Sequence, residues 1–312
     1  MPVPGEDLSA EFCFDNIPKC PKYPWWQISP MYRTYRHSAG SDPDPDSESV
    51  KDGFKANLES WGHVINTFDD VEGVYLDNLR KELGHDRVWA VGPLVLTRAG
   101  SVSPGLDADV ARFLDTCDDD SVVYVAFGSQ ITLRNDQLAA LAAGLEKSGV
   151  RFIWVAADGH VDGGYGSVPD GFETRVAGRG VVVRGWAPQA AILSHRAAGA
   201  FLTHCGWNSV VESIVAGVPM LTWPMGADQF SDATLVVNEL MVGVRVCEGK
   251  ASVPDSDELS RFLRDSVGRD SSFGSVLRER ARKLKEKALE AVKDGGSSAR
   301  GLNEMVRYLF DI

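Results

Sequence analysis

Six polar or aromatic side chains interrupt an otherwise apolar stretch near residue 200. The stretch reads "AFLTHCGWNSVVESIVAGVPMLTWPMGADQF" from Ala200 to Phe230, and the six residues are His204, Cys205, Trp207, Asn208, Ser209 and Glu212. Imidazole, amide and hydroxyl groups donate hydrogen bonds to phosphate oxygens, whereas a carboxylate accepts them from sugar hydroxyls. A glycine among them lets the backbone come close to a ligand. These residue types predict a ligand that carries phosphate and hydroxyl groups.

Two further loops carry polar residues of the same kind. "RGWAPQAAIL" contains Trp186, whose indole face can stack on a nucleobase, and "WPMGADQF" contains Asp228 and Gln229, which suit a ligand rich in hydroxyls. A base-stacking residue, a phosphate-binding turn and readers of sugar hydroxyls together predict a nucleotide sugar. Taken singly, the same residues have simpler interpretations, with Asn208 or Ser209 as a helix cap and Trp186 as a core residue.

The elements expected around these loops bring them to one edge of a sheet. Apolar runs predict strands at 121–129, 151–156, 180–186, 198–204, 217–224 and 242–246, with helices between them at 135–147, 188–193, 208–215 and 231–240 and a helical tail at 255–267, 272–292 and 299–310. This alternation predicts a parallel sheet covered on both faces, a doubly wound Rossmann-like α/β domain. Ligands of such a sheet bind outside the carboxyl ends of its strands, and the N–H groups at a helix start near Asn208 bind anions.

The first 95 residues follow a different pattern. Strands are expected only at 63–68 and 87–94, helices at 50–61 and 69–83, and the segment 38–49, rich in Ser, Asp and Pro, is typical of a solvated loop. A doubly wound domain has about five or six parallel strands, so we expect this region to be the C-terminal part of an incomplete N-terminal Rossmann-like domain. The expected organisation is a partial domain at 1–95, a linker at 96–110 and a ligand-binding domain with its helical tail at 111–312.

The composition limits the classes of partner. The formal net charge is −12, which disfavours binding to a phosphate backbone. The five cysteines are an odd number without a C-x-x-C pair, so neither a zinc site nor a disulfide framework is expected. The sequence shows neither a signal peptide nor an apolar run long enough to span a membrane. We expect a cytoplasmic monomer without nucleic acid, membrane span or metal.

The segment from Trp186 to Gln229 closely resembles the plant secondary-product glycosyltransferase box of the family-1 UDP-glycosyltransferases. It reads "WAPQAAILSHRAAGAFLTHCGWNSVVESIVAGVPMLTWPMGADQ" and matches the box without a gap. The strand "SVVYVAFGSQ" is also similar to the first strand of the C-terminal domain in this family. The segments "CPKYPWWQISPMYR" and "ELGHDRVWAVGPL" resemble those of a plant subgroup that acts on flavonols and phenolic acids. The resemblance implies a GT-B fold, in which the active site lies between two Rossmann-like domains.

The same resemblance implies a role for each residue of the box. Trp186 would stack on uracil, the Ala187 backbone would bond to the edge of the base, and Gln189 and Glu212 would hold the ribose. The diphosphate would be bound by His204, Asn208, Ser209 and Ser129, and the sugar by Trp207, Asp228 and Gln229. Trp207 together with Gln229 usually accompanies UDP-glucose in this family.

The implied reaction is inverting transfer of a sugar, expected to be glucose, from UDP to a hydroxyl of a small phenolic or flavonoid acceptor. The C-terminal domain would stabilise the leaving diphosphate without a metal or other cofactor. The family's catalytic His/Asp dyad is expected upstream of Met1, because none of His37, His63, His85, His160, His195 and His204 follows an early strand in a Gly-rich loop. Two alternatives remain open: a fragment that binds UDP-sugar without turnover, and a nucleotide-sugar epimerase of the same architecture.

Overall fold

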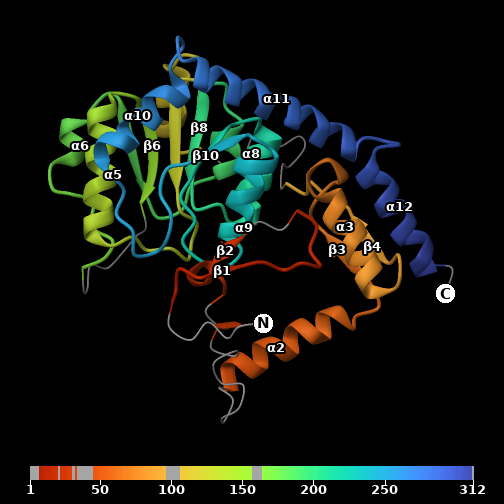
Figure 1. The fold of residues 1–312 in the computed structure, drawn as a ribbon. Coiled ribbons are helices and arrows are strands. Elements are labelled where there is room, and N and C mark those ends of the chain that lie inside the picture. The colour runs from red at the N-terminus through yellow and green to blue at the C-terminus, as the bar shows by residue number, and fades with distance from the viewer. Residues whose placement is uncertain are drawn as a thin grey trace. The chain divides into compact units, whose positions relative to one another are not determined.

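The computed structural model describes residues 7–19, 22–29, 32–33, 45–95, 106–156 and 164–310. The chain forms two compact units, the first made of Met1–Leu94, Gly226–Asp228 and Ala288–Ile312, and the second of Val95–Met225 and Gln229–Lys287. Each unit is considered by itself (Figure 1). His37, His160 and positions 96–105 of the expected linker lie outside the described residues.

The second unit contains a sheet of six parallel strands in the order β10-β9-β8-β5-β6-β7. The strands are β5 (Val122–Ala126), β6 (Arg151–Ala156), β7 (Gly180–Arg184), β8 (Ala198–Thr203), β9 (Met220–Thr222) and β10 (Gly243–Arg245). All six expected strands are therefore confirmed, several of them shorter than expected. The strand order runs outward in both directions from the neighbouring pair β5 and β8. Such a switch point is where doubly wound sheets bind their ligands.

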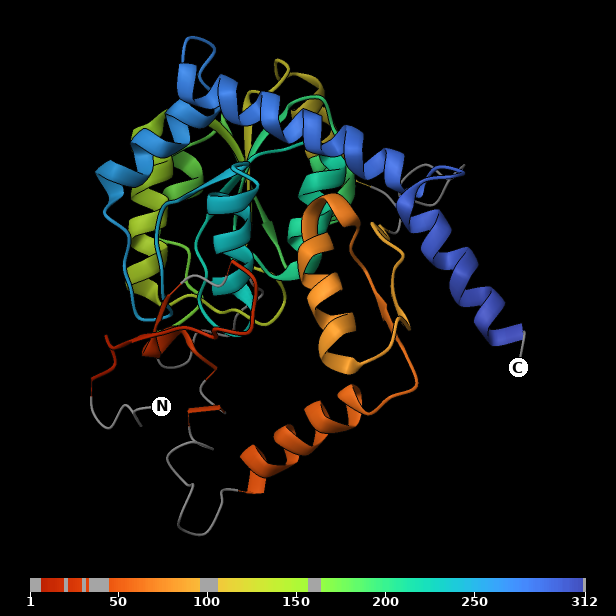
Figure 2. The same ribbon diagram turned by 45° about the vertical axis from the view of Figure 1, so that its right-hand side comes forward.

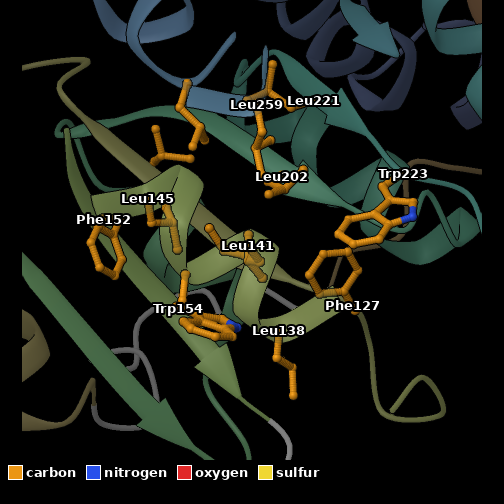
Figure 3. Close-up of a cluster of buried hydrophobic side chains, with 14 of the residues drawn as sticks. Phe127, Leu138, Leu141, Leu145, Phe152, Trp154, Leu202, Leu221, Trp223 and Leu259 are labelled. Atoms are coloured by element: carbon orange, nitrogen blue, oxygen red, sulfur yellow. The ribbon is translucent and has the colours of Figure 1, made fainter. Parts of the chain in front are cut away.

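Three helices cover one face of this sheet. They are α5 (Asn135–Ser148), α6 (Phe172–Arg175) and α10 (Ser256–Val267). Their apolar side chains pack with those of the strands in one cluster, in which Leu141 of α5, Phe152 of β6 and Leu202 of β8 are fully buried (Figure 3). Phe127 and Trp223 close the cluster with an edge-to-face ring contact at 5.2 Å. This core fixes the positions of the strand ends.

The remaining helices of the second unit include those that follow the polar loops. They are α4 (Ala108–Asp115), α7 (Gln189–Leu193), α8 (Trp207–Ala216), α9 (Gln229–Thr234), a π-helix (Leu235–Glu239) and α11 (Ser272–Val292), whose last residues are grouped with the first unit. Helices α7 and α8 contact each other and α7 contacts β8. Figure 2 shows α8 on the opposite side of the sheet from α5. The doubly wound α/β arrangement is thus confirmed.

In the described part of the first unit, two small sheets and the helices α2 (Pro45–Leu58), α3 (Asp69–Leu83) and α12 (Ser297–Phe310) can be distinguished. Strands β1 (Glu11–Phe12) and β2 (Tyr23–Pro24) pair antiparallel ahead of a short 3-10 helix (Trp25–Gln27), and β3 (His63–Ile65) pairs parallel with β4 (Val88–Ala90). Leu76 of α3 packs on Val88 and Ala90 of β4. The Ser298 hydroxyl of α12 donates to the Gly92 carbonyl, so the last helix is held against β4.

One local expectation was wrong. Segment 38–49 was expected to be a loop, but its last five residues form the first turn and a half of α2, which begins at Pro45. Proline suits the first position of a helix because its missing N–H would have no partner there. Asp46 and Glu48 in the same turn add favourable charge at the positive end of the helix. Among the described residues, no helix combines the length and hydrophobicity required to cross a membrane.

Candidate functional site

A pocket of about 1430 Å³ lies in the second unit, at the ends of the strands that form the switch point. Seven of the residues predicted from the sequence line it: Ser129, Trp186, Ala187, Gln189, Asn208, Ser209 and Glu212. They come from three segments, which follow β5, β7 and β8. The structure therefore brings together residues that are up to 83 positions apart in the sequence. This is expected for loops that follow the carboxyl ends of neighbouring parallel strands.

The side chain of Gln189 joins two of these segments. From the first position of α7 its Nε2 donates to Oε2 of Glu212 at 2.9 Å and to Oγ of Ser209 at 3.0 Å. Ser209 and Glu212 lie three residues apart on α8, so they occupy the same face of that helix. One amide group thus orients a hydroxyl and a carboxylate along one wall of the pocket.

Burial changes the acid–base properties of this wall. Removal of water raises the pKa of the Glu212 carboxyl above its ordinary range, and the hydrogen bond from Gln189 acts in the opposite direction. Tyr124 on β5 also lines the pocket, and its phenol has a strongly raised pKa because it is buried and because Glu212 carries negative charge nearby. Tyr124 therefore remains a neutral hydroxyl at any physiological pH.

The N-terminus of α8 is open to a ligand. Its cap residue is Gly206, which has extended backbone and makes no side-chain capping bond. The simpler interpretation of Asn208 or Ser209 as the cap is therefore wrong, because both lie inside the first turn. The N–H groups of a first helical turn have no partner within the helix, and together with the helix dipole they attract anions. Asn208 is exposed at this end and lines the pocket.

Trp186 presents its indole to solvent at the pocket. It follows β7 after Gly185, which has a left-handed backbone with φ of 84°. The side chain is 77% exposed, so the alternative interpretation as a core residue is wrong. The next residue, Ala187, is buried and its carbonyl accepts from the N–H of Gln189 at 2.9 Å. An exposed aromatic face beside fixed backbone groups suits a planar heterocycle.

The ring of His204 packs against two glycines. A β-carbon placed on Gly128 would lie 2.8 Å from His204 Nε2, and one placed on Gly206 would lie 2.6 Å from the same atom. Gly128 also has a φ of 72°, which side chains rarely adopt. Both glycines are thus required for the imidazole to lie between the loop after β5 and the start of α8. His204 is half-buried and does not line the pocket wall itself.

The structure places the three expected sugar contacts outside the pocket lining. Trp207 is the first residue of α8 and is half-buried. Gln229 begins α9, is 8% exposed, and accepts from the Met225 N–H through Oε1 at 2.9 Å. Asp228 is exposed and is grouped with the first unit, next to Ala227, whose φ is 53°.

Two lining residues with titratable side chains were not predicted from the sequence as site residues. Tyr124 lies within an apolar strand, where a tyrosine is an ordinary core residue, and only the pairing of β5 with β8 shows that it reaches the pocket. His195 also lines the pocket, with Nε2 3.3 Å from Asp115 Oδ1 and Nδ1 accepting from the Ala197 N–H at 3.2 Å. Both ring nitrogens of His195 already have protein partners, so this histidine has a structural role. No sequence pattern marks either contact.

In the part of the chain that the structure describes, no cluster of three or more histidine, cysteine, aspartate or glutamate side chains is arranged to hold a metal ion. The groups that line the pocket near the start of α8 and can donate to a phosphate are backbone N–H groups, the Asn208 amide and the hydroxyls of Ser129 and Ser209.

The second unit thus combines a doubly wound sheet with a helix start that has no side-chain cap, a half-buried carboxylate and an exposed indole, an arrangement that suits a nucleotide. The family model described as UDP-glucoronosyl and UDP-glucosyl transferase matches residues 100–260. The chain belongs to this family. The resemblance expected from the sequence is thus confirmed, as are the α/β fold class and its likeness to GT-B glycosyltransferases.

Characterised relatives give the closer context. The flavonol 3-O-glucosyltransferase UGT89B1 of Arabidopsis thaliana is 52% identical over 304 residues, covering 96% of this chain and 62% of the relative. The flavonol 7-O-rhamnosyltransferase of the same plant is 49% identical over 267 residues, covering 80% of this chain and 60% of the relative. The chain thus spans less than two thirds of the length of these relatives and is similar to plant flavonol glycosyltransferases.

Solved structures show the same likeness. The crystal structure of Arabidopsis thaliana UGT89C1 complexed with UDP-L-rhamnose has a TM-score of 0.73 at 47% identity, covering 85% of this chain and 62% of that one. Phytolacca americana UGT2 complexed with UDP-2fluoro-glucose and pterostilbene has a TM-score of 0.78 at 32% identity, covering 93% of this chain and 62% of that one.

Proposed function

We propose that the pocket of the second unit binds a UDP-sugar and that the chain serves glycosyl transfer to a hydroxyl of a small phenolic or flavonoid acceptor. The observation that carries this proposal is the single wall made by Gln189, Ser209 and Glu212 beside the exposed indole of Trp186. In this proposal the contacts to uracil, to ribose and to the diphosphate follow one another along the pocket. Relatives named for UDP-sugar and flavonol substrates support the assignment.

The roles within the site follow from the types of contact available. Trp186 stacks on uracil and the Ala187 backbone bonds to its edge, Gln189 and Glu212 hold the ribose, and the first turn of α8 binds the diphosphate with help from Ser129 and His204. Negative charge that grows on the diphosphate as the bond to the sugar breaks is stabilised by N–H groups already aimed at it. Trp207, Asp228 and Gln229 contact the sugar, for which we propose glucose. Positions 111–312 form the UDP-sugar-binding domain in this proposal, and 1–95 its acceptor-side partner.

Transfer also requires a general base that takes the proton of the acceptor hydroxyl. The described histidines have other roles: His195 is held by Asp115 and Ala197, His63 Nε2 lies 2.8 Å from the Asn57 carbonyl, and the His85 ring stacks on that of His63 at 6.4 Å. We therefore infer that this chain binds the donor and transfers sugar poorly or not at all. Loss of general-base help typically costs about 10²–10⁴ in rate.

The test has a binding arm and a turnover arm. Calorimetric titration of the folded chain with UDP and with UDP-glucose should show one site, and incubation with UDP-glucose and a panel of flavonols and phenolic acids should give far less product than a full-length relative. No binding of either nucleotide would overturn the donor-site proposal. Turnover equal to that of the relative would overturn the inference about the base, and His85 would be the first residue to substitute. Conversion of UDP-glucose without any acceptor would indicate an epimerase instead.

A further inference from the structure

Tyr124 is a buried polar residue to which the roles above assign nothing. It lies in the middle of β5, one of the two strands at the switch point, and pairs in register with Phe201 of β8. The two rings pack at 5.0 Å. Its neighbours Val123 and Val125 belong to the large core cluster on one face of the sheet, so Tyr124 faces the other side, to which α8 belongs.

The hydroxyl of Tyr124 is placed unusually for a core residue. The side chain is 1% exposed, yet the residue lines the pocket together with Gln189 and Glu212. The structure shows no hydrogen bond from this hydroxyl to another described residue, and the hydroxyl is not among the buried polar atoms left without a partner. It therefore reaches the pocket, where water or a ligand can contact it. A tyrosine used only to fill space here would be replaced by phenylalanine without loss.

Glu212 has unused capacity to accept hydrogen bonds. Its carboxylate accepts one bond from Gln189 at Oε2, and an ionised carboxylate can accept about four. Burial disfavours its charged form, and the pKa of the Tyr124 phenol is raised by burial first and by the negative charge of Glu212 second. Both residues line the same pocket on the α8 side of the sheet, with a donor on one side and spare acceptor capacity on the other.

We propose that Tyr124 is a positioning residue of the donor site, whose hydroxyl donates through one water to the Glu212 carboxylate and holds it for the ribose hydroxyls of a bound nucleoside diphosphate. This inference rests on the proposed function. A second donor beside Gln189 keeps the carboxylate ionised and fixes its orientation, so that its remaining lone pairs are aimed at the ribose. Tyr124 acts through Glu212 and does not itself contact the reacting atoms.

The test uses ligands that differ only in the ribose hydroxyls. UDP and 2′,3′-dideoxy-UDP are titrated into the wild-type chain, Tyr124→Phe and the control Tyr308→Phe, which removes a hydroxyl from a residue outside the pocket lining. Tyr124→Phe keeps the ring contact with Phe201, and its melting temperature shows that it is folded. We expect it to bind UDP about threefold to tenfold more weakly, the range for one hydrogen bond. Its affinity for the dideoxy ligand, and both affinities of Tyr308→Phe, should equal those of the wild type.

A second comparison separates positioning from packing. In a Glu212→Gln background, adding Tyr124→Phe should change UDP affinity less than twofold, about the limit of independent effects. Equal weakening for UDP and the dideoxy ligand would assign Tyr124 a packing role and overturn the inference, as would unchanged UDP affinity. Failure of the wild-type chain to bind UDP would instead overturn the proposed function on which the inference rests.

Discussion

Gln189 and Glu212, 23 positions apart in the sequence, are joined by a hydrogen bond of 2.9 Å between Nε2 and Oε2. The bond connects the start of α7 to the middle of α8, and the same amide also reaches Ser209. The position of the Glu212 carboxylate on the pocket wall therefore depends on a residue from another loop.

Replacing Gln189 by leucine tests this dependence. The variant keeps the size of the side chain but leaves Ser209 and Glu212 without their shared donor. Hydrogen bonds to charged groups contribute about 1.5–3 kcal/mol, so UDP affinity should fall about tenfold to a hundredfold. Isothermal titration of UDP measures the change. An affinity within twofold of wild type would show that the amide does not organise the site.

The pH dependence of UDP binding should reveal the buried carboxylate. Because burial raises the pKa of Glu212, the group takes up a proton at a higher pH than an ordinary glutamate as the solution is acidified. Ionised Glu212 accepts from the ribose, so binding is strongest above this raised pKa and is lost as the pH falls through it. Titrations from about pH 5 to about pH 8 should show the loss in the wild type. The phosphate groups of UDP also titrate, and Glu212→Gln corrects for them. Identical pH profiles for the two proteins would contradict the role of Glu212.

The raised pKa of Glu212 makes the stability of the folded protein depend on pH in the opposite direction from UDP binding. A group whose pKa is higher in the folded protein stabilises it most below its unfolded value, and this contribution is lost as pH rises through the folded value. Glu212→Gln should therefore unfold at higher urea concentration than the wild type near neutral pH, with the difference shrinking in acid.

Gly206→Ala should displace the imidazole of His204. The new β-carbon would lie 2.6 Å from Nε2, and the side chain must move because the backbone of Gly206 is already ordinary and extended. Loss of one donor to a charged diphosphate should weaken UDP binding about tenfold. Gly73→Ala is the control, because the nearest atom to its β-carbon lies 3.6 Å away. Equal affinities for both variants would show that His204 does not contact the diphosphate.

The contact between α12 and β4 can be tested by stability alone. A β-carbon on Gly301 would lie 2.6 Å from the Ala90 carbonyl oxygen, a backbone atom that cannot move away freely. Gly301→Ala should therefore destabilise the protein by about 1–3 kcal/mol. Gly53→Ala, within α2, meets no atom within 4 Å and should stabilise by about 0.5–1 kcal/mol. Urea unfolding curves give both values, and a neutral Gly301→Ala would contradict the packing of the last helix.

The sequence was sufficient for the regular part of the fold. The strands of the parallel sheet are continuous apolar runs, and α3 spans the predicted residues 69–83. Several short elements were not predicted. Strands β1 and β2 have two residues each, too few for a periodic signal, and α4 begins at Ala108 inside a segment of linker-like composition. The start of α2 was misjudged because proline and acidic residues mark both loops and first helical turns.

The site was predictable where chain topology decides it. Residues after parallel strands meet at one edge, so the loops of Trp186 and Asn208 were expected to face the same ligand, and both line the pocket. The network around Gln189 and the position of Tyr124 depend on helix rotation and strand register. These follow from packing of the whole sheet, and no local pattern of residues encodes them.

The most direct test of the account is the titration of UDP into the wild-type chain and into Trp186→Ala. Stacking of a base on an aromatic ring contributes about 1–3 kcal/mol, so the variant should bind UDP about fivefold to a hundredfold more weakly. Trp61→Ala is the control, since Trp61 is also exposed but does not line the pocket. Unchanged affinity for Trp186→Ala, or an equal loss for Trp61→Ala, would contradict the assignment of this pocket as the UDP-sugar site.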